Sequence, residues 1–127
     1  MLTTLWDRLS AIVVALEGLG LAVLVGWEVV ALVTGDTGIV STALALLVLS
    51  AVFAAAVIAF AVGLWRGLSW GRSGGIVTQL LILAVALGAA TGQYAEPVTA
   101  LWLAVPAVIT LTLLIFAVRA SGRSARE

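Results

Sequence analysis

Apolar residues fill this chain in long runs, and only short polar segments interrupt them. A bilayer hydrocarbon core of about 30 Å is crossed by roughly 20 helical residues. Runs that satisfy this length lie at about 9–34, 39–65, 73–92 and 97–118. The pattern therefore predicts an all-α integral membrane protein, with one membrane domain over residues 1–127. Its tail at 119–127 is expected to be small, polar and frayed from residue 120 onwards.

The segments between the apolar runs are short. Glycine at Gly35 is suited to ending the first helix, and Pro97 is suited to the first turn of the last one. A hinge at 66–72 and a turn at 93–96 complete the connections. Because short connections make successive helices pack against each other in opposite directions, we expect an antiparallel four-helix bundle.

Positive charge lies on one side of this pattern. The arginines are Arg8, Arg66, Arg72, Arg119, Arg123 and Arg126. The other two connections carry only the acids Asp36 and Glu96. Since basic residues stay on the cytoplasmic side, both termini are predicted to be cytoplasmic.

The hinge arginines have two interpretations. Arg66 and Arg72, with Trp70 between them, can set the topology and contact anionic lipid headgroups. The alternative is a specific docking site for a lipid or a protein. Trp6, Trp65 and Trp70 near the cytoplasmic boundary and Trp27, Tyr94 and Trp102 near the other are typical of interfacial aromatic belts.

Composition narrows the possible functions. The chain is 64% hydrophobic and 9% charged, so lipid rather than water must cover its surface, and its net charge of zero disfavours a nucleic-acid partner. Cysteine and histidine are absent, which removes the common metal and haem ligands and the usual general base. We therefore expect no cofactor, no bound metal and no enzymatic activity.

Small residues recur at four-residue spacing within three of the spans. The three sets are Gly18, Ala22 and Gly26; Ala51, Ala55, Ala59 and Gly63; and Ala84, Gly88 and Gly92. Such faces let neighbouring backbones approach closely, which drives helix association in lipid. They predict a tight bundle, and one of them can face another copy of the chain, so a homo-oligomer or a subunit of a membrane complex is expected.

Pro106 lies inside the fourth span. A proline leaves the carbonyl four residues earlier without its helical donor, so a kink is expected there. The kink can serve packing or a gate.

Glu17 is the principal candidate for a functional residue. It lies nine residues after Arg8, which places it about 13 Å deep and close to the midplane. Gln79 lies seven residues after Arg72, at a similar depth of about 10 Å, and is the expected partner. Thr78, Ser50 and Thr110 are further possible partners.

Removal from water favours the neutral form of a carboxyl group, so Glu17 is expected to be protonated. Two roles stay open, a proton- or cation-handling site and a hydrogen bond that holds helices together. Glu28 lies eleven residues further along the same helix face, and there an interfacial acid in contact with water is favoured over a functional site.

The segment Gly67-Leu68-Ser69-Trp70-Gly71-Arg72, followed by Gln79-Leu80-Leu81, resembles a pattern in small four-span integral membrane proteins of high-GC Gram-positive bacteria, as does Glu17. The resemblance implies the four-span fold, a bacterial plasma membrane, and interest in Glu17, Trp70, Arg72 and Gln79. It implies no chemistry.

A glutamate midway along the first of four spans is also similar to the small multidrug-resistance exporters. Two features depart from that family. No aromatic cluster accompanies Glu17, and the third span lacks a Trp-Ser-Gly-type segment. The strong arginine asymmetry also favours one orientation, whereas some of those exporters insert both ways.

A membrane-embedded enzyme acting on lipid would need paired acids or a nucleophile–base pair at one depth, and the sequence contains neither. Two functional hypotheses are therefore favoured. The first is a non-enzymatic accessory or structural subunit that packs with itself or with a larger membrane complex. The alternative is a small proton- or cation-coupled transporter or channel centred on Glu17.

Overall fold

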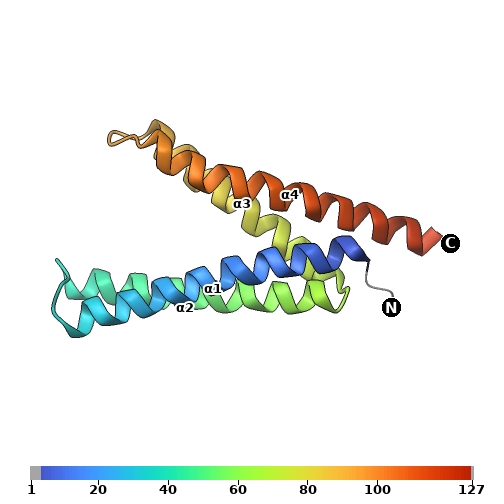
Figure 1. Cartoon of the computed structure of the whole chain (residues 1–127). Helices are drawn as coiled ribbons and strands as arrows, with labels where there is room; N and C mark the ends of the chain where they lie inside the picture. Colours follow the sequence, from blue (N-terminus) through green and yellow to red (C-terminus); the bar gives the residue numbers. More distant parts are fainter. Residues whose placement is uncertain (1–3, 127) are drawn as a thin grey trace.

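The computed structural model describes residues 4–126 and contains helices only in that range (Figure 1). The helices are α1 (Leu5–Val33), α2 (Val40–Trp65), α3 (Ser69–Thr91) and α4 (Pro97–Arg126). All four are long and apolar enough to cross a membrane. The predicted all-helical class is therefore confirmed, and the four helices suit a multi-pass membrane protein.

The helices form two pairs. α1 packs along α2 and α3 packs along α4, while α2 contacts α3 and α1 contacts α4 less extensively. The pairs meet at the end where α1 begins and α4 ends, and they separate towards the connections 34–39 and 92–96 (Figure 1). We call these the closed end and the open end.

The core lies in the closed half. Ala11 and Val14 of α1, Val57 and Leu64 of α2, and Leu114 of α4 form one buried apolar cluster. Since lipid offers apolar side chains no reason to leave it, this cluster holds the helices by close packing rather than by expulsion of water.

Two helices begin earlier than the apolar pattern predicts. α1 begins at Leu5 because Thr4 and Asp7 form a capping box, each side chain accepting from the other's backbone N–H. α3 begins at Ser69, inside the predicted hinge. Gly67 allows this tight connection because it adopts a φ of +72°, and Leu68 N–H donates to the Gly63 carbonyl at 2.8 Å.

The last helix is longer than predicted. α4 continues to Arg126, beyond the predicted end of the fourth span at residue 118, and the fraying of the tail stays a prediction. α4 also continues through Pro106, and the predicted bend at that residue stays a prediction.

The small residues that pack the helices are mostly not the predicted ones. Gly18 is buried against Val57 and Ile58, and Gly63 lies against Gly71 and Trp70. The remaining members of the three sets are exposed, namely Ala22, Gly26, Ala51, Ala55, Ala59, Ala84, Gly88 and Gly92. These residues are therefore not buried inside one chain, and their role in helix association stays a prediction. Ala22, Gly26, Ala84, Gly88 and Gly92 lie in the parts of α1 and α3 towards the open end, where the two pairs separate.

Packing at the closed end depends on glycines that the pattern did not single out for this role. A methyl group at Gly71 would lie 2.5 Å from the backbone nitrogen of Leu64, and one at Gly75 would lie 3.1 Å from a Leu114 methyl group. The start of α3 therefore approaches the end of α2 with its backbone, a closeness that only glycine permits.

Candidate functional site

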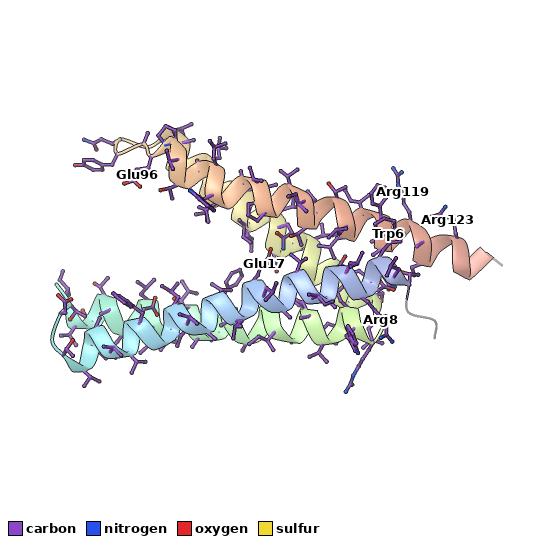
Figure 2. All side chains as sticks on the ribbon, in the orientation of Figure 1. Trp6, Arg8, Glu17, Glu96, Arg119 and Arg123 are labelled. Atoms are coloured by element: carbon purple, nitrogen blue, oxygen red, sulfur yellow. The ribbon has the colours of Figure 1, made fainter. Side chains whose placement is uncertain are left out.

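The Glu17 side chain lies between the two helix pairs (Figure 2). The Gln79 side-chain nitrogen on α3 donates to Glu17 Oε2 at 2.7 Å, and the Thr110 hydroxyl on α4 lies 3.4 Å from Glu17 Oε1. Gln79 and Thr110 are fully buried. One carboxyl group therefore links three helices through both of its oxygens, and Gln79 is the partner that its depth predicts.

Thr110 divides its hydroxyl between two oxygens. It donates to the Pro106 carbonyl one turn earlier at 2.8 Å, and its contact with Glu17 is the longer one. A hydroxyl group has a single hydrogen, so the Pro106 carbonyl and Glu17 Oε1 compete for it, and the Pro106 carbonyl makes the shorter bond.

Gln79 has an unused acceptor. Its side-chain oxygen is buried and has no hydrogen-bond partner among the described residues. Buried polar atoms nearly always have partners. The cluster thus contains one acceptor that a water molecule or a cation could satisfy.

The other proposed partners of Glu17 lie elsewhere. Thr78 donates to the Gly74 carbonyl of its own helix at 2.9 Å, and Ser50 donates to Glu28 at 3.0 Å. Glu28 is half-buried between α1 and α2 and is held by a hydrogen bond to a neighbouring helix. The prediction that Glu28 is only an interfacial acid in contact with water is therefore incomplete.

A second polar link, between Asp7 and Arg72, lies at the closed end. The Arg72 guanidinium lies 3.4 Å from the Asp7 carboxylate, and it also donates to the Gly67 carbonyl at 3.0 Å. The Asp7 side chain is 1% exposed and that of Arg72 is 11% exposed. The hydrophobic pattern of the sequence gives no sign that Asp7 is buried. The local signal is the Thr4-x-x-Asp7 spacing of a helix cap, which indicates that the Asp7 side chain has a structural role.

Both polar links join α1 to α3, which lie diagonally opposite in the order of contacts α1–α2–α3–α4–α1. Asp7 and Glu17 are ten residues apart on α1, while Arg72 and Gln79 are seven apart on α3. Polar side chains thus reach across the middle of the closed half, between two helices that are not neighbours in this order.

The hinge residues divide into two kinds. Arg66 and Trp70 are exposed, and the Trp70 ring contacts the edge of Phe60 with 6.4 Å between ring centroids. Arg72 is nearly buried by its pairing with Asp7, so the expectation that it contacts lipid headgroups is wrong. Asp7 draws Arg72 inwards because a buried carboxylate needs a charged partner.

The ends of the molecule carry different charges. Arg8, Arg119 and Arg123 lie at the closed end, and Glu96 lies at the open end (Figure 2). The Arg126 side chain lies outside the described residues. Pro106 is exposed on α4, and its carbonyl is the acceptor for Thr110.

Comparison with known proteins adds no assignment. The chain matches no protein-family model, no curated protein and no solved structure. The functional conclusion therefore depends on the geometry of the polar cluster and on the surfaces that the fold leaves uncovered.

Proposed function

We propose that this membrane protein is a non-enzymatic accessory or structural subunit. It packs with further copies of itself or with a larger membrane complex. The observation that carries the proposal is the separation of the two helix pairs towards the open end (Figure 1). Gly26 and Gly88 lie in this half, and a methyl group at either would meet nothing within 4 Å. Small-residue faces associate closely in lipid, so these surfaces suit other transmembrane helices.

The closed half supports the same proposal. Glu17 bonds to Gln79 and lies beside Thr110, so its carboxyl group can act as a connection between three helices. A packed closed half with an uncovered open half is suited to binding a partner.

The test is self-association in vesicles, measured by energy transfer between labelled copies. Gly88→Leu should reduce association because it adds bulk to an uncovered small-residue face. Val85→Leu, which changes an exposed residue one turn earlier by a single methylene, is the matched control. Wild-type protein that stays monomeric, and that co-purifies from its native membrane without any other protein, would contradict the proposal.

We further propose an antiparallel bundle in a bacterial plasma membrane with both termini in the cytoplasm. The support is the gathering of Arg8, Arg119 and Arg123 at the closed end, since arginine is retained on the cytoplasmic side. Cysteines introduced at the exposed positions Asp36 and Ser69 should react with an impermeant thiol reagent from opposite sides. Reaction of both from the outside would overturn this topology.

The second candidate function is a proton- or cation-coupled transporter or channel centred on Glu17. The unpartnered oxygen of Gln79 favours it, because together with Glu17 and Thr110 it offers oxygen ligands in one buried place. Glu17→Gln separates the two functions. Glutamine keeps the hydrogen bonds of an accessory subunit, so association should persist, whereas a carrier should lose proton or cation flux across reconstituted vesicles.

Glu28→Gln is the matched control for the flux measurement, because it removes a second intramembrane acid from the same helix. Flux that Glu17→Gln abolishes and Glu28→Gln preserves would establish the transporter and displace the accessory subunit. The absence of flux in wild-type vesicles would remove the transporter.

A further inference from the structure

The surface of the α1–α2 pair contains an apolar groove of about 760 Å³. Only residues of α1, of α2 and of the connection that follows α2 line it, so neither α3 nor α4 covers it. Ala11 and Ala61 form a buried floor, and the larger side chains of Ile12 and Ile58 contribute exposed walls. Small residues between larger ones thus form the groove, and it lies on a face of the α1–α2 pair that lipid would contact.

The groove has the length of a lipid chain in one leaflet. Along α1 it extends from Ala11 to Leu19, and along α2 from Trp65 back to Ile58. Eight residues of helix span about 12 Å. Half of the hydrocarbon core is about 15 Å thick. The groove therefore extends from the closed end most of the way to the middle of the bilayer.

Positive charge lies at one end of the groove. Arg66 lines the groove and is exposed. The guanidinium carbon of Arg8 lies 4.5 Å from the centroid of the Trp65 ring, which also lines the groove. Within residues 4–123, whose side chains the structure describes, neither arginine pairs with an acid, and Asp7 is already paired with Arg72. Two cations that pair with no acid of the described side chains therefore border the apolar groove.

We propose that the groove binds an anionic glycerophospholipid. One acyl chain lies along the alanine floor between α1 and α2, and the phosphate accepts hydrogen bonds from the Arg66 guanidinium. Arg8, held over Trp65, adds a second positive charge at the headgroup. A zwitterionic lipid would bring its own ammonium group close to these arginines, so the charge at this end selects an anionic headgroup.

The experiment is native mass spectrometry of the full chain, purified in mild detergent and offered equal amounts of phosphatidylglycerol and phosphatidylcholine. Wild-type protein should retain one phosphatidylglycerol in preference to phosphatidylcholine. Arg66→Gln should lower that preference by about fivefold, the factor expected for one arginine near a headgroup. Ala15→Phe fills the groove and should reduce retention of both lipids.

Each variant has a matched control. Arg123→Gln removes an exposed arginine at the same end from outside the groove, and Ala22→Phe adds the same bulk two turns further along α1, beyond the groove. Both should retain lipid as the wild type does. Helical content and elution volume establish that each variant is folded, and Arg66→Lys, which keeps the charge, should retain the preference for phosphatidylglycerol.

Three outcomes would overturn the proposal. They are equal retention of the two lipids by the wild type, an equal loss of preference in Arg123→Gln and Arg66→Gln, and full retention by folded Ala15→Phe. The second would show that the positive end attracts anionic lipid without a specific site.

Discussion

The Gln79 side-chain nitrogen lies 2.7 Å from Glu17 Oε2, and this hydrogen bond joins α3 to α1 across the bundle. Glu17 lies where the two helix pairs begin to separate (Figure 2). The hydrogen bond between Glu17 and Gln79 therefore lies at the limit of the closed half. Its loss should weaken the packing of both helix pairs.

Gln79→Leu is predicted to destabilise the fold by about 1–2 kcal/mol, because it leaves a buried carboxyl group without its best partner. The double variant Glu17→Leu with Gln79→Leu should be more stable than Gln79→Leu alone, since it removes both polar groups together. Reversible unfolding in mixed micelles measures both. A double variant less stable than either single variant would show that the carboxyl group does not depend on Gln79.

Arg72→Gln is predicted to lower the free energy of unfolding in mixed micelles by about 3 kcal/mol, because it leaves the Asp7 carboxylate buried and unpaired. Adding Asp7→Asn should restore part of the loss, as the buried charge then disappears. Arg123→Gln removes an exposed arginine from the same end and should change stability by less than about 0.5 kcal/mol. Equal effects of Arg72→Gln and Arg123→Gln would argue against the buried pair.

Gly71→Ala is predicted to destabilise by about 1–3 kcal/mol, since its methyl group would press against the backbone of Gly63 and Leu64. Gly20→Ala adds the same methyl group to an exposed face of α1, where nothing lies within 4 Å. It should be neutral or stabilising by up to about 1 kcal/mol, because alanine favours the helix. A stabilising Gly71→Ala would refute the close approach of α3 to α2.

Ser50→Ala is predicted to lower the free energy of unfolding by about 0.6 kcal/mol, because it removes the hydroxyl group that donates to Glu28. This is the average value for an interhelical hydrogen bond in a membrane. Ser41→Ala, at an exposed position on the same helix, should have no measurable effect. The comparison also tests Glu28 as a packing residue, since an acid in contact with water would lose nothing when Ser50 is removed.

Much of the fold can be predicted from hydropathy and from helical rise along the sequence. The number of helices and their approximate extents depend on hydropathy, because a bilayer demands long apolar helices whatever their neighbours. The pairing of Glu17 with Gln79 could also be predicted, since helical rise alone sets the depth of a residue. Depth is a property of position along the chain, so the sequence contains it.

The sequence did not determine which helix faces meet. Small residues at four-residue spacing occur on several faces of these helices, and only the arrangement of the two pairs decided that Gly71, Gly74 and Gly75 are packed while Ala22, Gly26 and Gly88 are uncovered. The buried Asp7–Arg72 pair and the groove that ends at Arg66 also arise from helix rotation and separation. Apolar side chains on every face of a transmembrane helix are stable in contact with lipid, so hydropathy does not indicate which face packs against another helix. The rotation of each helix about its axis is therefore known only from the tertiary structure.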